Sequence, residues 1–134
     1  MARVSEGLLR KVDAVTFKVP TLDDGLAFYA DRLGHVLKWR NDGIGQAGLA
    51  VPGSDTEIVL TTEHGYEPNW LVESVDEAAG EIAGAGGAIL VEPFDIPVGH
   101  VGVVADPFGN VLVLVDLTTG RYATDAAGNV TGVG

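Results

Sequence analysis

The sequence predicts an α+β fold in which two βαβββ modules form a curled mixed sheet, followed by a short C-terminal hairpin. Three observations predict this fold: an internal repeat, β-prone runs after each copy of the repeat, and a strong turn signal between the last two runs. The expected boundaries are about 12–62 for the first module, about 67–117 for the second and 118–134 for the tail, within one domain of residues 1–134.

The internal repeat pairs VTFKVPTLDDGLAFYADRLG (15–34) with PNWLVESVDEAAGEIAGAGG (68–87), a shift of 53 residues from position 15 to position 68. In each copy a strand ends and a hydroxyl residue is followed three positions later by an acid, a pattern that starts helices. These pairs are Thr21 with Asp24 and Ser74 with Glu77. Gly34 and Gly87 then provide residues that end helices in the left-handed conformation.

Three β-prone runs follow each helix and complete the modules. They are residues 36–39, 44–51 and 57–62 in the first module, and 88–92, 100–105 and 110–116 in the second. Asp106, Pro107 and Gly109 form a turn signal, since Asp bonds to the following backbone, Pro fixes φ and Gly tolerates positive φ. In the tail, DAAGN (125–129) predicts the turn of a further hairpin.

Composition and charge exclude several function classes. Acidic residues outnumber basic ones 19 to 8, for a net charge of −11. Nucleic acids and anionic membranes require clustered cations, so we expect neither as a partner. The chain has no cysteine, which rules out disulfides and thiolate chemistry. No apolar run approaches the roughly 18 residues that span a bilayer, and no secretory signal is visible, so we expect a cytoplasmic protein.

The stretches VPTLDDGLAFYADRLG and ADPFGNVLVLVD, together with the two modules, resemble the vicinal oxygen chelate superfamily. This superfamily includes glyoxalase I, extradiol dioxygenases and bleomycin-resistance proteins, and the resemblance covers about residues 12–117. It implies that the strands curl into a cup, and that metal enzymes place ligands on the concave face of the first and last strands of each module. It also implies a homodimer, with the cup formed within one chain or by exchange between chains.

The resemblance carries the metal-ligand positions over one at a time. Where a His or Gln would stand in the first strand, this chain has Ala14, and where a His would begin the second module it has Glu67. The last strands have Val59 and Val113 at the corresponding positions, with Glu57 two residues before Val59 on the same face. A divalent ion needs three or four convergent N or O donors. We therefore expect no metal and no other cofactor.

The three histidines do not supply the missing donors. His64 lies in the loop between the modules, His35 follows the first helix and His100 begins a strand. None coincides with a ligand position, so we expect surface or loop residues.

Strand alternation predicts which side chains line the concave face. The expected pocket residues are Ala14, Thr16, Val59, Thr61, Asn69, Val111 and Val113. Leu112, Leu114 and Trp70 are expected on the opposite face, against a helix. Trp39, beside the RNDG turn, fits either the mouth of the pocket or the seam of a dimer.

A mostly apolar pocket with a few polar groups is typical of a small-molecule site. The first hypothesis is a metal-independent binding protein of the glyoxalase/bleomycin-resistance type, which sequesters a cationic or aromatic antibiotic or metabolite. The alternative is a metal-free lyase or isomerase with Glu57 or Glu67 as its base, although both glutamates could equally be exposed acids at strand ends. A weaker alternative is a glyoxalase-like metalloenzyme with shifted ligands.

Overall fold

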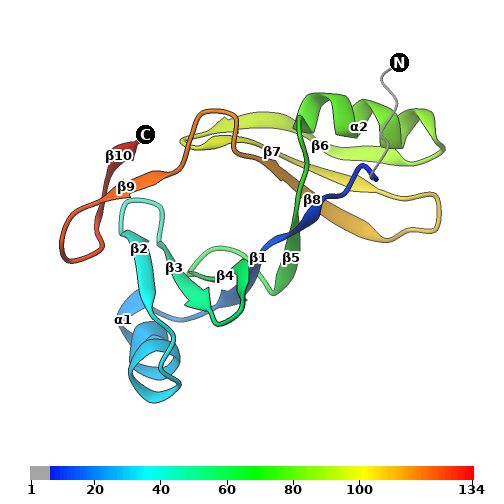
Figure 1. Cartoon of the computed structure of the whole chain (residues 1–134). Coiled ribbons are helices and arrows are strands. Elements are labelled where there is room, and N and C mark those ends of the chain that lie inside the picture. Colours follow the sequence, from blue (N-terminus) through cyan, green and yellow to red (C-terminus); the bar gives the residue numbers. More distant parts are fainter. Residues whose placement is uncertain (1–6) are drawn as a thin grey trace. The chain divides into compact units, whose positions relative to one another are not determined.

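The computed structural model describes residues 7–134, which divide into two compact units (Figure 1). The first unit comprises Asp13–Pro68 and Tyr122–Gly134, and the second comprises 7–12 and Asn69–Arg121. The last thirteen residues of the chain therefore fold with the first module rather than with the second, which immediately precedes them.

The first module has the predicted order of strand, helix and three strands. Its elements are β1 (Lys11–Lys18), α1 (Leu22–Leu26), the π-helix η1 (Ala27–Arg32), β2 (Leu37–Asn41), β3 (Gln46–Val51) and β4 (Ser54–Thr61). The sheet order is β2-β3-β4-β1, with β1 parallel to β4 and the other neighbours antiparallel.

The second module repeats this arrangement. Its elements are β5 (Glu67–Leu71), α2 (Val75–Gly84), β6 (Ala88–Ile96), β7 (Gly99–Ala105) and β8 (Val111–Asp116), in the sheet order β6-β7-β8-β5 with β5 parallel to β8. In the tail, β9 (Tyr122–Thr124) and β10 (Val130–Val133) form a two-stranded antiparallel sheet. The α+β fold class, the two βαβββ modules and the tail hairpin are thus confirmed.

Both predicted helix starts are confirmed by a side-chain hydrogen bond. Thr21 Oγ1 accepts from the Asp24 N–H at 3.0 Å, and Ser74 Oγ accepts from the Glu77 N–H at 3.3 Å. Each bond satisfies one backbone donor that a helix leaves unpaired at its first turn. The repeated hydroxyl and acid pattern therefore has the same physical role in both modules.

The helix ends agree with the prediction in one module and differ in the other. Gly34 takes a φ of +84°, as expected for a residue that ends a helix. In the second module it is Gly86, not Gly87, that takes the positive φ, at +103°. Gly87 is required for another reason, because a Cβ there would meet the backbone oxygens of Ala105 and Ile82.

Two strands run further than the sequence predicted. Strand β2 continues through Arg40 and Asn41, so the turn begins two residues later than the RNDG motif suggested. Strand β6 continues past residue 92 through Pro93 to Ile96, with register shifts along its pairing to β7. Proline is tolerated there because β6 is the edge strand of its unit, where one row of N–H groups has no partner strand.

Each unit has its own hydrophobic core between the sheet and its helix. The first contains Val19, Leu22, Ala47, Leu49 and Leu60, and the second contains Val72, Val75, Ala78, Ala79, Val104 and Leu114. Trp70 and Leu112 pack against the second core together with Leu114, as predicted. The facing of these three residues toward the helix was therefore correctly inferred from alternation.

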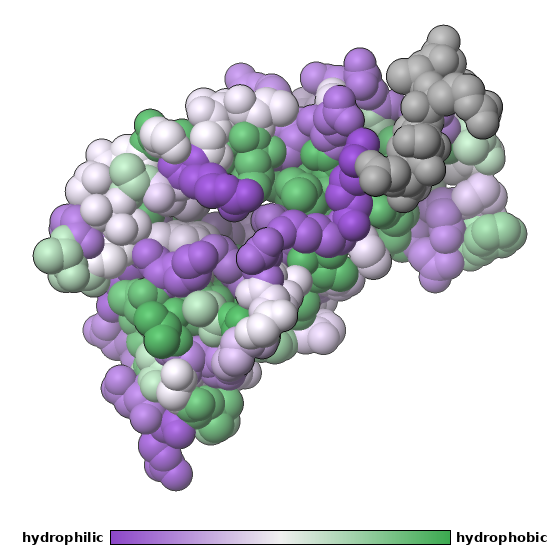
Figure 2. Space-filling model, in the orientation of Figure 1, coloured by the Kyte–Doolittle hydropathy of each residue, from purple (hydrophilic) through white to green (hydrophobic). Residues whose placement is uncertain are grey.

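The surface mixes hydrophilic and hydrophobic side chains in the view of Figure 2. Several large apolar side chains are exposed, among them Tyr66 in the first unit and Phe108 in the second. Within residues 7–134, no helix is long and apolar enough to cross a membrane.

Candidate functional site

The first unit's sheet has one face that its helices do not cover, which we call the helix-free face. The parallel pairing of β1 with β4 places Ala14 beside Glu57, Thr16 beside Val59 and Lys18 beside Thr61. Ala14 and Val59 are 4% and 6% exposed and share a small apolar cluster separate from the helix-side core. The structure thus brings these predicted site residues of the first module onto one face.

A row of four residues crosses this face, one from each strand: Trp39, Gly48, Val59 and Thr16. A Cβ on Gly48 would collide with the indole of Trp39, so the ring lies directly over the glycine backbone. The missing side chain at Gly48 lets the indole extend across β3 toward β4, where it packs with Val59. Glycine is required here for close approach rather than for its φ.

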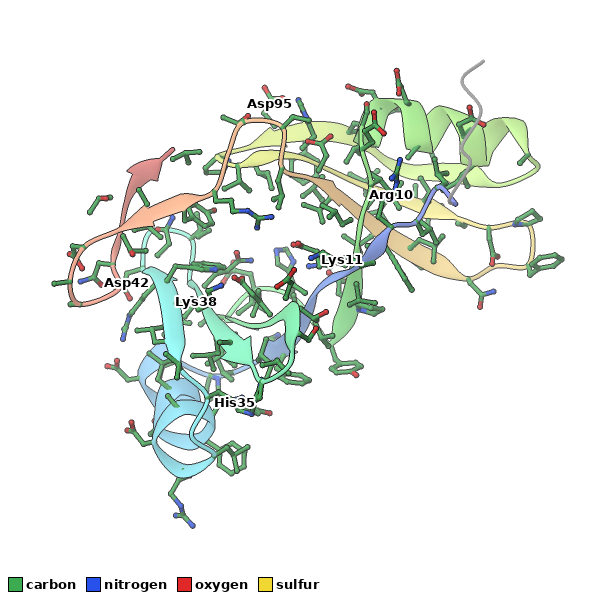
Figure 3. All side chains as sticks on the ribbon, viewed as in Figure 1. Arg10, Lys11, His35, Lys38, Asp42 and Asp95 are labelled. Atoms are coloured by element: carbon green, nitrogen blue, oxygen red, sulfur yellow. The ribbon has the colours of Figure 1, made fainter. Side chains whose placement is uncertain are left out.

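The indole N–H of Trp39 points toward the carboxylate of Glu57. Trp39 Nε1 donates to Glu57 Oε1 at 2.8 Å, and Lys38 Nζ lies 3.8 Å from Glu57 Oε2. The Glu57 side chain is only 23% exposed, whereas that of Lys38, labelled on β2 in Figure 3, is 52% exposed. One hydrogen bond and one ion pair therefore orient this partly shielded carboxylate.

The two threonines of the face use their hydroxyls to hold the loop after β4. Thr16 Oγ1 donates to Gly65 O at 2.8 Å and accepts from the Glu67 N–H at 3.2 Å. Thr61 Oγ1 accepts from the Glu63 N–H, also at 3.2 Å. Thr16 and Thr61 are buried. Both hydroxyls are thus engaged with backbone, and the backbone of the predicted base Glu67 lies next to Thr16.

The tail hairpin covers part of the helix-free face. Tyr122 and Val130 pack against the cluster of Ala14, Trp39 and Val59. The rings of Tyr122 and Trp39 have centroids 4.8 Å apart and planes inclined by 41°. Burial raises the pKa of the Tyr122 hydroxyl. Sequence analysis missed Tyr122, because nothing in the tail indicates which module its hairpin packs against.

The second unit has an equivalent row with different side chains: Val91, Val103, Val113 and Asn69. Val113 is 8% exposed, and Val111, two residues earlier on β8, is 57% exposed. The Asn69 Oδ1 atom is buried and has no hydrogen-bond partner among the described residues. The predicted site residues of this module therefore share one sheet, and no aromatic residue lies in its row.

Asp116, at the end of β8, joins three elements of the second unit. One carboxylate oxygen accepts from the Val75 N–H at the start of α2, at 2.8 Å. The other accepts from the His100 N–H at 3.1 Å and from the Thr118 hydroxyl at 2.8 Å. The His100 ring places Nδ1 3.0 Å from the same oxygen, and its Nε2 lies 3.3 Å from Asp95.

The pKa values of Asp116 and His100 are shifted in opposite directions. Burial of Asp116 favours its neutral form, but the donors from Val75, His100 and Thr118 together lower the pKa of the carboxyl below its usual value. The hydrogen bond to Asp116 raises the pKa of His100, with a further contribution from Asp95. His100 was expected to be a surface or loop residue, and only its position opposite the acid ending β8 could have indicated the pair.

The other two histidines, His35 and His64, make their hydrogen bonds away from the pair of Asp116 and His100. The His35 Nδ1 lies 3.1 Å from the carbonyl oxygen of Ala50. The backbone N–H of His64 donates to Thr61 Oγ1. Within residues 7–134, no three His, Asp or Glu side chains gather as a group that could hold a metal ion.

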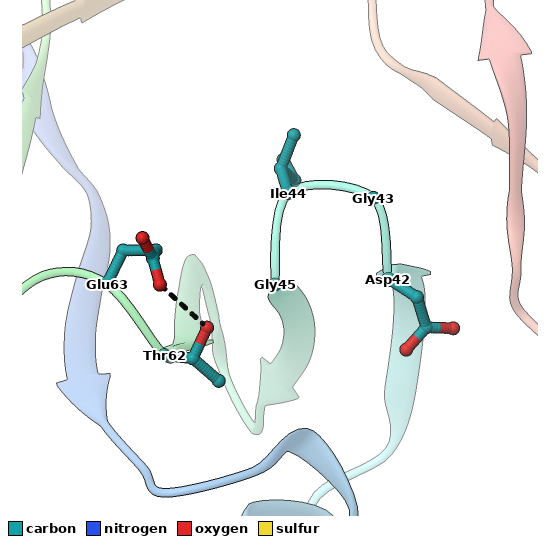
Figure 4. A pocket seen from close by; sticks show the side chains of 6 residues that line it. All are labelled: Asp42, Gly43, Ile44, Gly45, Thr62 and Glu63. Carbon is teal, nitrogen blue, oxygen red and sulfur yellow. Dashed lines mark hydrogen bonds between the residues drawn. The ribbon is translucent and has the colours of Figure 1, made fainter.

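An open hollow lies beside the turn that follows β2 (Figure 4). It is lined by Asp42, Gly43, Ile44, Gly45, Thr62 and Glu63. Thr62 donates to Glu63 at 3.5 Å, and Asp42 forms an ion pair with Arg40. Its polar groups thus bind one another or their neighbours, and it contains none of the predicted site residues.

The order and pairing of the strands agree with the protein family that the sequence matches. Residues 11–114 match the family described as the Glyoxalase/Bleomycin resistance protein/Dioxygenase superfamily. The chain belongs to this superfamily. The resemblance inferred from the two sequence motifs is thereby confirmed.

Proteins similar to this member of the superfamily include an uncharacterised protein of Mycolicibacterium smegmatis. The two are 34% identical over 109 residues, which is 77% of this chain and 90% of the relative. Among solved structures, methylmalonyl-CoA epimerase from Mycobacterium tuberculosis has a TM-score of 0.66 and 23% identity, over 85% of this chain and 92% of that one.

A variant of Streptomyces coelicolor methylmalonyl-CoA epimerase, in complex with 2-nitronate-propionyl-CoA, has a TM-score of 0.62 and 20% identity. It covers 81% of this chain and 97% of the epimerase. At these identities the epimerases share the fold with this chain.

Few side chains at the metal-ligand positions that the resemblance predicts carry a donor atom. Ala14, Val59 and Val113 have only aliphatic side chains, and all three are buried. The fourth position, Glu67, offers one carboxylate, and Glu57 is already engaged by Trp39. These residues do not fit a divalent transition metal at the ligand positions that the resemblance predicts, since three of the four have no donor atom.

Proposed function

We propose that this protein is a metal-independent small-molecule-binding protein of the glyoxalase/bleomycin-resistance type. The observation that supports the proposal is that three of the four predicted ligand positions, those of Ala14, Val59 and Val113, have aliphatic side chains. Burial of Ala14 and Val59 beside Trp39 makes an apolar wall suited to an organic ligand rather than to an ion. The ligand that we infer is an aromatic or cationic antibiotic or metabolite.

The test combines metal analysis with a binding screen. We expect purified protein to contain far less than one transition metal per chain, and addition of Zn²⁺ or Ni²⁺ to leave its melting temperature unchanged. Aromatic and cationic small molecules are then screened by thermal shift, where a bound ligand raises the melting temperature by mass action. One tightly bound transition metal per chain would refute the metal-independent proposal.

The two tryptophans provide a matched pair of variants for any molecule found in the screen. Trp39 lies on the helix-free face, whereas Trp70 packs on the helix side of the other unit. We expect Trp39→Ala to weaken binding at least tenfold, since a buried aromatic anchor contributes more than about 1.4 kcal/mol. Trp70→Phe should leave affinity unchanged. Equal effects of both substitutions would contradict the assignment of the site.

A second candidate is a metal-free isomerase or lyase in which Glu57 is the base. The observation that favours it is the fixed orientation of a partly shielded carboxylate beside an apolar wall. Glu67 is the other candidate base predicted from the sequence. Once a substrate is known, Glu57→Gln should abolish turnover and spare binding, and Glu67→Gln is the matched comparison. Full turnover by Glu57→Gln would eliminate Glu57 as the base.

Three further proposals concern the state of the protein. We propose that the two units act together as one domain, that the chain forms a homodimer, and that it is cytoplasmic. Light scattering coupled to size-exclusion chromatography measures the mass of the assembly directly against the 13.9 kDa of one chain. A mass of one chain at micromolar concentration would refute the dimer.

A further inference from the structure

The tail hairpin, residues 122–133, joins the edge strand β2 and covers part of the helix-free face. Tyr122 places its ring 4.8 Å from that of Trp39, and Val130 contacts the same apolar cluster. This is the face on which we propose that a ligand binds. One aromatic side chain of the protein therefore already occupies the position that an aromatic ligand would take.

Among residues 7–134, few backbone interactions hold the tail hairpin against the sheet. The Arg40 N–H donates to Gly128 O at 2.8 Å, and Arg40 and Asn129 form an isolated parallel bridge. Strand β9 has three residues and β10 has four, and their register shifts between Val130 and Gly132. Isolated two-stranded hairpins are marginally stable, and elements with few buried contacts open at the lowest free energy.

The turn of the tail hairpin is closed by its own residues. Asp125 Oδ1 accepts from the Ala127 and Asn129 N–H groups at 2.9 and 3.0 Å, and the Asp125 N–H donates back to Asn129 O at 2.9 Å. The hairpin therefore does not need the sheet to keep its turn. Its internal hydrogen bonds would therefore remain intact if the hairpin moved away from the helix-free face as a body.

We propose that Tyr122 is an internal substitute for the ligand, and that the ligand's planar aromatic ring replaces it on Trp39 when the tail hairpin opens. This inference rests on the proposed small-molecule binding and names the ligand class. The ring that fits is uncharged, since the wall consists of Ala14, Val59 and Trp39. The nearby carboxylate of Glu57 is already matched by the indole N–H and by Lys38.

The experiment locks the hairpin closed with a disulfide. Arg40 and Asn129 lie opposite each other in the isolated bridge, and adjacent bridge partners have a spacing that a disulfide can span. Because the chain has no cysteine of its own, the double variant Arg40→Cys with Asn129→Cys has a single possible disulfide within one chain. Non-reducing electrophoresis separates this form from disulfide-linked chains. The reduced form of the double variant is the matched control, because it carries the same two substitutions without the lock.

The probe is 2-naphthol, a neutral planar aromatic molecule, titrated into ¹⁵N-labelled protein. The readout is the indole N–H signal of Trp39, which Trp70→Phe identifies because the chain has only two tryptophans. We expect the wild-type and reduced proteins to bind and the oxidised protein to bind at least tenfold more weakly. Tyr122→Ala should bind up to about tenfold more tightly than wild type, since the competing aromatic pair is gone.

The outcomes separate the two proposals. If oxidised and reduced proteins bind equally, or if wild type binds and Tyr122→Ala binds no more tightly, the role of Tyr122 is refuted and the proposed function stands. If the Trp39 signal does not move in any form, including Tyr122→Ala, binding of a neutral aromatic ring on this face is refuted, and the thermal-shift screen remains the test of the proposed function. Hydrogen exchange gives an independent readout, because the Arg40 amide should exchange faster than that of Leu60 in the core strand β4. Equal protection of the two amides would contradict opening of the hairpin alone.

Discussion

Replacement of Asp116 by asparagine should strongly destabilise the protein, because this carboxylate serves donors from three elements. An amide keeps only one acceptor oxygen. The least costly orientation turns the NH₂ group toward the Val75 N–H, which then loses its 2.8 Å bond at the start of α2. An unsatisfied buried donor costs about 1–3 kcal/mol. The bonds from His100 and Thr118 lose the charge of their acceptor, which adds roughly 1 kcal/mol. We therefore expect a loss of about 3 kcal/mol.

The contribution of Asp116 depends on pH in a defined direction. The folded-state pKa of its carboxyl is lowered, so its stabilisation is present above the unfolded-state pKa and is lost as the pH falls through the folded value. The pKa of His100 is raised, so its stabilisation is complete below its unfolded-state pKa and disappears as the pH rises through the folded value. The difference between wild type and Asp116→Asn should therefore be largest at mildly acidic pH, between these two ranges.

Urea denaturation at a series of pH values measures this difference, as a shift in midpoint at constant slope. Asp95→Asn is the matched control, since Asp95 contacts the same imidazole at 3.3 Å but is 93% exposed. Exposed ion pairs contribute little, so this variant should remain within about 0.5 kcal/mol of wild type. A loss below 0.5 kcal/mol for Asp116→Asn, or an equal loss for Asp95→Asn, would refute the reasoning.

Three further predictions test other parts of the structure. Gly48→Ala should displace the indole of Trp39 and shift its N–H signal. It should also destabilise the protein by about 1–3 kcal/mol, measured by urea denaturation. An unshifted indole signal would contradict the close approach of Trp39 to Gly48. Thr16→Val should cost about 1–3 kcal/mol, since it leaves backbone groups of the loop after β4 unpaired, and a neutral result would show that water replaces the hydroxyl. Asp125→Ala should increase hydrogen exchange in the tail hairpin and leave β7 and β8 protected. Asp106→Ala should increase exchange in β7 and β8 and leave the tail hairpin protected. Identical exchange patterns would show that the two turns are not independent.

The fold was predictable because it repeats local signals that do not depend on distant contacts. Thr21 and Ser74 start helices through bonds to residues three positions away, and DPFGN closes its hairpin through Asp106 and Asn110. DAAGN in the tail forms the same set of bonds. Alternation then assigned the faces of the strands, since side chains in a strand have a period of two.

The candidate site was only partly predictable because its decisive contacts join residues far apart in the chain. Alternation correctly placed Ala14 and Val59 on one face. It could not show that Trp39 crosses β3, because that depends on the missing side chain of Gly48 in the neighbouring strand. Nor could it place Tyr122, since a hairpin in the tail has no periodic signal that names its partner.

The return of residues 122–134 to the first unit has a practical consequence for work on this protein. An affinity tag or fusion partner attached after Gly134 would begin at the end of β10, in the hairpin that covers the proposed ligand face, although that position follows the other module in sequence. Such a tag could hold the hairpin open, or itself cover Trp39. Binding measurements should therefore use protein whose C-terminal tag has been removed, or compare both tagging positions.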